Sequence, residues 1–207
     1  MKNSNPVKHI GHVILHPFSG FWDLKWEKQG RLPVALSIAA LALVTYIVKR
    51  CYAGFIFNTT DLTEMNIVLE VMALALLFVL WSASNWCLTS LMDGKGTFRD
   101  IVIAAGYALA PYVLLNLPMV FLSQFMVSDE SVFYYGTAAL SLLWCGLLLV
   151  SGVMMTHDYS LKKTVLTVIC ILVGMALMLF LGMLLFSILQ KIFQYIYAVY
   201  IEISYRI

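Results

Sequence analysis

The sequence predicts an all-α, polytopic membrane protein with five transmembrane helices, preceded by an amphipathic helix at the membrane interface. Composition is the first reason, because 62% of the 207 residues are hydrophobic and the mean hydropathy is +0.89. Charge is the second, since 12% of the residues are charged, whereas a soluble domain carries about 25%. The third is that five apolar segments reach the roughly 20 helical residues needed to cross a hydrocarbon core.

These apolar segments divide the chain. We expect spans at 33–52, 66–91, 101–126, 132–155 and 165–189. The linkers between them are short, so consecutive spans should run antiparallel in one compact bundle. The expected domains are a cytoplasmic segment with the interfacial helix (1–31), a five-helix transmembrane domain (32–190) and a C-terminal amphipathic tail (191–207). We expect the tail to continue as a helix or lie at the interface, although its last residues alternate and would also suit a short strand on a partner.

The distribution of Lys and Arg predicts the orientation of the spans, because cytoplasmic connections carry an excess of these residues. The N-terminal segment has five, and the second and fourth connections have two each, so nine lie on one side and four on the other. This count predicts a cytoplasmic N-terminus and a C-terminus outside. Lys49 and Arg50 lie on the outer side and oppose the assignment.

The segment before the first span carries large aromatic residues at helical spacing. An amphipathic helix in the headgroup region would place such residues at the interface. They would equally suit a stripe that packs on the cytoplasmic mouth of the bundle. The expected interfacial anchors are Phe18, Phe21, Trp22 and Trp26.

The second connection contains Gly94-Lys95-Gly96-Thr97, which looks like part of a phosphate-binding loop. A Walker loop requires a glycine where this chain has Thr89, and a Ser or Thr directly after the lysine, where it has Gly96. A membrane span also takes the place of the buried strand that precedes such a loop. The pattern therefore favours a tight cytoplasmic turn over a nucleotide site.

Each residue of this turn has an expected role. Asp93-Gly94 and Gly96 are expected to supply positive-φ positions. Thr97 is expected to cap the next helix, with Asp100 as its reciprocal partner. The basic anchors expected to face anionic headgroups are Lys95 and Arg99.

The third span combines prolines with a polar residue. Pro111 and Pro118 each remove a backbone donor, and in lipid a freed carbonyl must be satisfied by protein or water. Asn116 lies between them and is placed to bond across to the second span, which offers Ser82, Ser84, Asn85 and Thr89. One interpretation is a kinked helix held to its neighbour. The other is a polar seam that binds a lipid, a partner helix or a solute.

Ionisable residues give little sign of chemistry. Glu70 is the only carboxylate well inside a predicted span, and the sequence offers no second intramembrane charge to pair with it, so it should reach the outer interface rather than couple ions. His9, His12 and His16 fall near one helical face, but no Cys or carboxylate completes a metal site. We therefore expect no catalytic, metal or cofactor site. The net charge of +2 is too small to indicate nucleic-acid binding.

These motifs resemble those of the YIP family, the Ypt/Rab-interacting membrane proteins, and in particular its bacterial branch. The resemblance covers Asn85-Trp86, the Gly94–Arg99 connection, the aromatic segment and the third-span motif Gly106-Tyr107-Ala108-Leu109-Ala110-Pro111. It implies a cytoplasmic N-terminus, five spans and a non-enzymatic role. Eukaryotic members carry an aspartate-leucine and a glycine-proline pair before the first span. Here Asp23-Leu24 is followed by Lys25-Trp26, which argues against binding a small GTPase.

The leading interpretation is a non-enzymatic scaffold or accessory protein of the bacterial plasma membrane. It would act through contacts with the lipid bilayer and with other membrane proteins or further copies of itself. Partner contacts are expected at the aromatic helix, the second connection and the kinked third span. The alternative is a subunit or partner of a membrane transporter, with Asn85, Pro111 and Asn116 lining a route.

Overall fold

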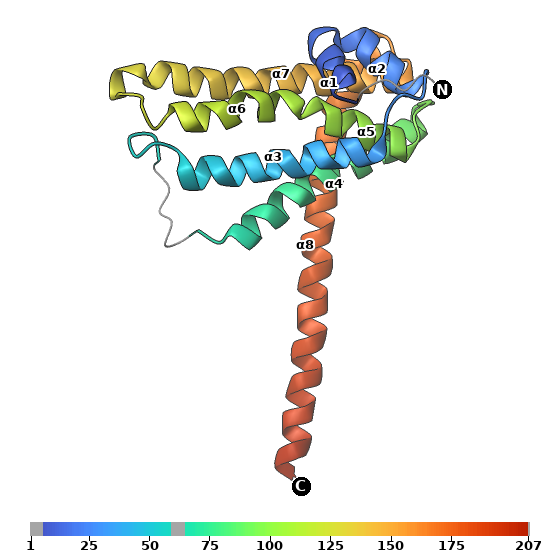
Figure 1. Cartoon of the computed structure of the whole chain (residues 1–207). Coiled ribbons are helices and arrows are strands. Elements are labelled where there is room, and N and C mark those ends of the chain that lie inside the picture. The colour runs from blue at the N-terminus through green and yellow to red at the C-terminus, as the bar shows by residue number, and fades with distance from the viewer. Residues whose placement is uncertain (1–5, 59–64, 207) are drawn as a thin grey trace.

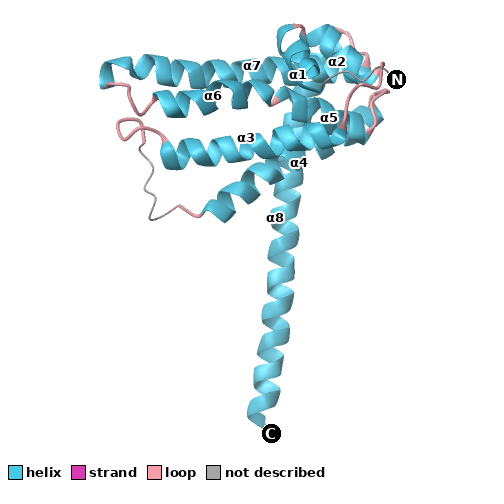
Figure 2. Cartoon of the chain, viewed as in Figure 1, coloured by secondary structure: helices cyan, strands magenta, loops and turns pink. Residues whose placement is uncertain are grey.

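The computed structural model describes residues 6–58 and 65–206, and every regular element in these ranges is helical (Figures 1 and 2). Five segments are long and apolar enough to cross a membrane, which confirms the expected fold class. The elements are α1 (Pro6–Leu15), α2 (Pro17–Lys25), α3 (Leu32–Tyr52), α4 (Ile67–Leu91), α5 (Phe98–Ala108), α6 (Ala110–Leu122), η1 (Ser128–Glu130), α7 (Ser131–His157) and α8 (Leu161–Arg206). The candidate spans are Leu32–Tyr52, Ile67–Leu91, Phe98–Leu122, Ser128–His157 and Leu161–Tyr205.

Local sequence signals explain where the first two spans begin and end. α3 has Pro33 in its first turn, where a missing N–H is harmless. It ends with Lys49 and Arg50, whose positive charges are favourable at the carboxyl end of a helix. α4 begins after Asn66, whose side chain accepts hydrogen bonds from two free N–H groups of the first turn.

The helices from α3 to α7 form one bundle. Figure 1 shows α3, α6 and α7 side by side. The end of α3, the start of α4 and the α6–α7 connection lie at one end, which we call the far end. The N-terminal helices and the α4–α5 connection lie at the opposite end, which we call the near end. Consecutive spans therefore alternate in direction as far as α7, as the short linkers predict.

α8 departs from this arrangement. It is 46 residues long, crosses the other helices and then projects away from them (Figure 1). Ile171 and Met175 in its first third pack in one cluster with Trp81 of α4 and Val153 of α7, whereas every residue from 179 to 200 is exposed. The expectation of one compact five-span bundle is therefore wrong for the last span, because its packing residues lie only near its start. The helix also continues to Arg206, whereas the alternative of a short strand on a partner stays a prediction.

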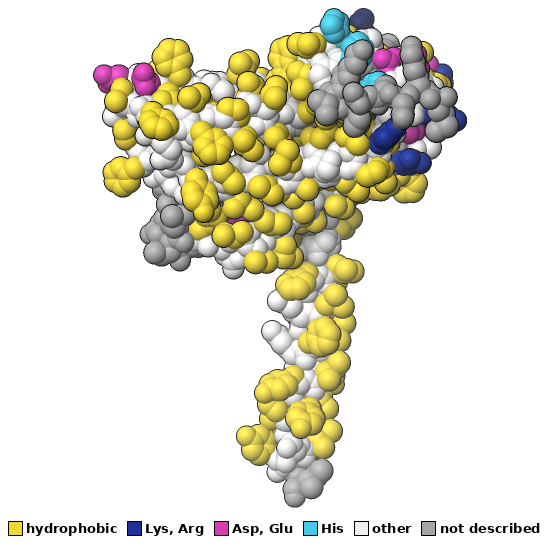
Figure 3. Space-filling view, in the orientation of Figure 1, with side chains coloured by type: hydrophobic (Ala, Val, Ile, Leu, Met, Phe, Trp, Pro, Cys, Tyr) yellow, Lys and Arg dark blue, Asp and Glu magenta, His cyan; other side chains and the backbone are white. Residues whose placement is uncertain are grey.

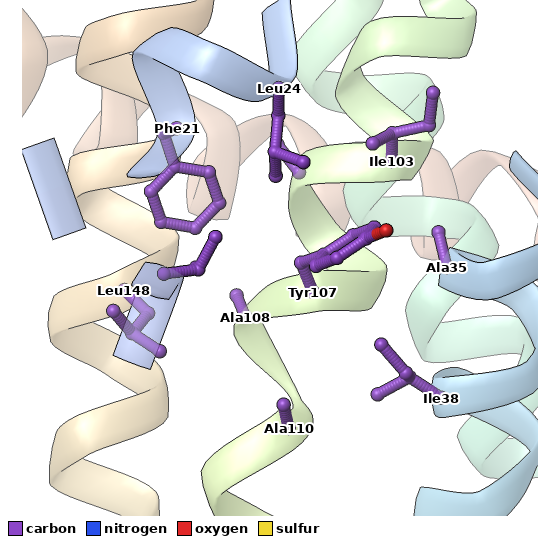
Figure 4. Close-up of a cluster of buried hydrophobic side chains, with 11 residues drawn as sticks. Phe21, Leu24, Ala35, Ile38, Ile103, Tyr107, Ala108, Ala110 and Leu148 are labelled. Carbon is purple, nitrogen blue, oxygen red and sulfur yellow. The ribbon is translucent and has the colours of Figure 1, made fainter. Parts of the chain in front are cut away.

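The main core lies toward the near end and joins α1, α2 and the bundle (Figure 4). Its largest side chains, Tyr107 of α5 and Phe21 of α2, are each 1% exposed. Gly106 lets α5 approach α3 closely, since a Cβ at this position would lie 2.6 Å from the carbonyl oxygen of Ala35. The glycine-tyrosine pair of the third span is therefore a packing motif in this structure.

The third span is interrupted where the sequence predicts a kink. α5 ends at Ala108 and α6 begins at Ala110, so Leu109 forms the break two residues before Pro111. The backbone N–H of Leu109 donates to the carbonyl of Gly106, 3.2 Å away, in a tighter turn than an α-helix makes. Pro118 lies inside α6 without ending it.

The N-terminal segment forms two short helices rather than one. α2 packs Phe21 and Leu24 into the core, and the exposed fractions of Phe18, Trp22 and Trp26 are 52%, 45% and 40%. The expectation that Phe21 anchors the protein at the interface is therefore wrong, because this ring fills the space beside Gly152 of α7. One face of α2 thus covers the bundle, as the packing interpretation expects, while contact of Phe18, Trp22 and Trp26 with the membrane interface stays a prediction.

Candidate functional site

The turn between α4 and α5 has the cap that the sequence predicts. The Thr97 hydroxyl accepts from the backbone N–H of Asp100, and the Asp100 carboxylate accepts from the backbone N–H of Thr97 at 3.0 Å. Asp93 has a φ of 57°, whereas no described glycine has a positive φ. The prediction of positive φ at Gly94 and Gly96 is therefore wrong.

The two glycines are needed for close approach to α7. A Cβ on Gly94 would lie 2.6 Å from Nδ1 of His157, and one on Gly96 would lie 2.7 Å from Cε1 of the same ring. The ring is 1% exposed, and the backbone N–H of Gly96 donates to its Nδ1 at 3.3 Å. The His157 ring thus packs against the inner side of the turn. The sequence places this histidine in a connection, and only the tertiary structure brings it under the glycines.

Charged residues join three segments at the near end. Lys25 of α2 pairs with Asp100 of α5, and Lys95 lies 2.7 Å from Asp158 of the α7–α8 connection. Arg99 is exposed beside them. The three segments with the most Lys and Arg therefore meet at one end of the bundle, which is the geometry that the charge-based orientation requires.

Tyr159 and Lys163 donate hydrogen bonds to a backbone carbonyl at the carboxyl end of α4. The Tyr159 hydroxyl and the Lys163 ammonium donate to the carbonyl oxygen of Met92 at 2.9 and 2.8 Å. Burial, together with the nearby Asp93 carboxylate, raises the pKa of Tyr159 above its ordinary value. The turn is thus fixed on its inner side by His157, whereas Lys95 and Thr97 stay exposed on its outer side.

Asn116 is the centre of a buried polar cluster inside the bundle. Its amide nitrogen donates to the Ser141 hydroxyl of α7 at 2.7 Å and to the Tyr112 carbonyl at 3.0 Å. Its carbonyl oxygen accepts from the Lys49 ammonium of α3 at 2.7 Å. The expected partners on the second span are therefore wrong, because Asn116 lies on the face of α6 toward α3 and α7.

The polar residues of the second span have other roles. Ser84 donates to the carbonyl of Ile171 in α8 at 2.8 Å. Asn85 is 3% exposed and lines a narrow space with Ile101 and Thr156. Asn85 and Asn116 therefore belong to separate clusters.

An ion pair lies at the far end. Arg50 of α3 is 3.1 Å from Glu70 of α4. The expectation that Glu70 has no intramembrane partner is wrong, because the antiparallel course of α3 and α4 brings the last turn of one beside the first turn of the other. Lys49 and Arg50, the two residues that oppose the charge-based orientation, both have partners inside the protein.

The histidines of the N-terminal segment form no metal cluster. His12 lies 3.4 Å from Asp23, and its ring stacks on that of His16. Among the residues that the structure describes, no group of three or more His, Cys, Asp or Glu side chains is arranged to hold a metal ion.

The fold and these contacts define an integral membrane protein held together by helix packing and short polar bridges. A family profile described as the Yip1 domain matches residues 11–191, and the chain belongs to this family. Comparisons with curated proteins and with solved structures found no match. The matched region ends within the projecting part of α8.

Proposed function

We propose that this protein is a non-enzymatic scaffold or accessory protein of the bacterial plasma membrane, acting through helix contacts with other membrane proteins or further copies of itself. Membership of the Yip1 domain family supports a membrane protein with five candidate spans. The observation that carries the proposal is the exposed length of α8, which no other part of the described chain covers (Figure 3).

The length of α8 exceeds what a single crossing needs. At 1.5 Å per residue, its 46 residues extend about 69 Å, more than twice the roughly 30 Å of a hydrocarbon core. Large side chains cover all its sides, including Phe186 and Phe193, which are 61% and 70% exposed. Helix association in lipid depends on van der Waals packing and is favoured by small residues, and α8 exposes Ala176 and Gly182 among these large side chains. A helix that leaves its own bundle with this surface exposed is suited to contact a partner.

The outer part of α8 also has the residues of a membrane boundary. Tyr195, Tyr197, Tyr200 and Tyr205 follow Lys191 along the exposed helix. Tyrosine and lysine are favoured at headgroup level, where the ring stays apolar and the polar tip is hydrated. This pattern supports a helix whose apolar part lies in lipid and whose end reaches the interface.

Contact through α8 is tested by truncating the large side chains of one helix face at a time. One variant replaces Leu181, Leu184, Leu185 and Ile188 with alanine, and a second replaces Leu179, Met183 and Phe186 on the opposite face. Alanine preserves the helix, so both proteins should insert. We expect one variant to lose the partner that co-purifies with the unmodified protein in mild detergent. If both variants recover the same partners in the same amounts, or if the unmodified protein is always a lone monomer, the proposal is wrong.

The orientation belongs to the same proposal: the N-terminus is cytoplasmic and the C-terminus lies outside. The gathering of Lys25, Lys95 and Lys163 at the near end supports it, because positive charge favours the cytoplasmic side. Accessibility tags at Met1 and Ile207 test the point. Labelling of both tags from the same face of the membrane would contradict the orientation.

The partner surfaces expected from sequence now divide into two groups. Phe18, Trp22, Trp26 and Arg99 are exposed and stay candidates for lipid or partner contact. Gly94, Gly96, Gly106, Tyr107 and Asn116 pack inside the protein, and we propose that they support the shape of the bundle. The interior also favours a scaffold over a transporter, because Asn116 is bonded to Lys49, Tyr112 and Ser141 while Asn85 lines a narrow space beside Ile101 and Thr156.

A further inference from the structure

A large apolar cavity lies between α3, α4 and α7. Its volume is about 860 Å³, within the 300–1,000 Å³ that is typical of small-molecule sites. The walls consist of small, aliphatic and aromatic side chains. Representative lining residues are Ala39, Leu43, Leu74, Phe78, Ala138 and Leu142.

One end of this cavity is basic. Among the described residues that line it, the charged ones are Lys49 and Arg50, both in the last turn of α3. Arg50 pairs with Glu70, but the contacts of Lys49 are neutral: the oxygen of Asn116 at 2.7 Å and the ring of Tyr134 at 5.4 Å. Nε of Arg50 is buried and has no hydrogen-bond partner among the described residues. An ammonium with only neutral neighbours in a partly desolvated site is stabilised by an added negative charge.

The length of the cavity fits the depth of a lipid leaflet. The lining follows α3 from Leu36 to Lys49, which is about 20 Å at 1.5 Å per residue. Half of a hydrocarbon core is about 15 Å. A chain that enters beside Lys49 and runs toward Leu36 therefore stays within apolar walls over the depth of one leaflet.

The geometry points to an anionic phospholipid as the occupant, with an acyl chain between α3, α4 and α7 and its phosphate beside Lys49 and Arg50. A helix from a second copy fits less well, since the exposed length of α8 from 179 to 200 contains no Asp or Glu and would bring no negative charge to Lys49. The lipid site is separate from the α8 surface. Its test needs no partner protein, so its failure and the failure of the proposed function are distinguishable.

The test measures lipid retention by native mass spectrometry on delipidated protein. Phosphatidylglycerol and phosphatidylcholine with identical acyl chains are added in turn. We expect phosphatidylglycerol to be retained at least tenfold more strongly. Lys49→Gln should reduce that preference about tenfold, whereas Lys191→Gln, which removes an exposed lysine of α8, should leave it unchanged.

A second variant tests the apolar part without altering charge. Ala138→Phe places a ring inside the cavity and should reduce retention of both lipids, with Ala176→Phe on the exposed part of α8 as its matched control. If Lys49→Gln fails to fold, as judged by its melting temperature, the effect of Ala138→Phe on lipid retention serves as the test of the site.

Three results would overturn the lipid site. The first is equal retention of the two lipids, or retention that neither variant changes. The second is displacement of the lipid by inorganic phosphate alone, which would show a free-anion site. The third is efficient crosslinking between cysteines placed in α8 of one copy and at Ala138 of another, which would show that a helix fills the cavity.

Discussion

Arg50 at the end of α3 lies 3.1 Å from Glu70 at the start of α4, and this ion pair joins the first two spans at the far end. The side chains are 37% and 22% exposed, so the pair is partly shielded from solvent. The Arg50 guanidinium also donates to the Tyr46 hydroxyl at 3.2 Å. The carboxylate inside the membrane is therefore explained by a structural contact and needs no ion-coupling role.

Glu70→Gln should lower the free energy of unfolding by about 1–2 kcal/mol, between the values typical of exposed and buried ion pairs. The cause is an arginine left without its counter-charge. Chemical denaturation in detergent measures the change. Asp129→Asn, at the same end and exposed, is the control and should have no effect. Reversing both charges should recover part of the loss, and a double reversal no better than the single ones would argue against the pair.

Asn116→Leu should lower the free energy of unfolding by about 2–3 kcal/mol, since interhelical polar bonds contribute about 0.6–2 kcal/mol each. The substitution removes the bonds to Lys49, Tyr112 and Ser141 together. Thermal unfolding in detergent measures it, with Gln190→Leu on the exposed part of α8 as the control. An unchanged melting temperature would show that this cluster does not hold the bundle.

Gly106→Ala should destabilise the protein by about 1–3 kcal/mol, the usual effect of overpacking a core. The added methyl would lie 2.6 Å from the backbone of Ala35, which cannot move without shifting α3. Gly146→Ala is the matched control, because a Cβ there meets nothing within 4 Å. That variant should be neutral or slightly stabilising, since alanine favours a helix. Equal effects at the two positions would contradict the packing role.

Lys95→Ala should cost less than about 1 kcal/mol, and the cost should fall as salt is added, because this ion pair is exposed. The Lys95 side chain is 59% exposed and its partner Asp158 is 46% exposed. Thermal melts at low and high salt measure the effect. Adding ATP or GTP should leave the melting temperature unchanged. A nucleotide-induced increase that Lys95→Ala abolishes would instead restore the phosphate-loop interpretation.

The features that the sequence predicts well are local. Hydropathy locates the five spans, Pro111 marks the break at Leu109, and the Thr97–Asp100 cap follows from spacing alone. Each depends on residues within one or two helical turns, where sequence distance and spatial distance agree.

The features that the sequence misses depend on which helix faces meet. Asn116 bonds to Lys49 of α3 and Ser141 of α7, and its position within the third span does not indicate which neighbouring helices it faces. His157 reaches the turn at Gly94 from 63 residues further along the chain. The course of α8 has a related explanation, because strong hydrophobicity shows that a helix can lie in lipid but not which of its faces other helices cover.

Site-specific photocrosslinking from α8 in native membranes tests the proposed function most directly. A photoreactive residue at Phe186 or Phe193 samples the projecting helix, and one at Leu143, 68% exposed on α7, samples an equally exposed surface of the bundle. The scaffold proposal predicts a protein adduct of defined mass from at least one α8 position and lipid adducts alone from Leu143. Lipid adducts alone from all three positions would contradict it.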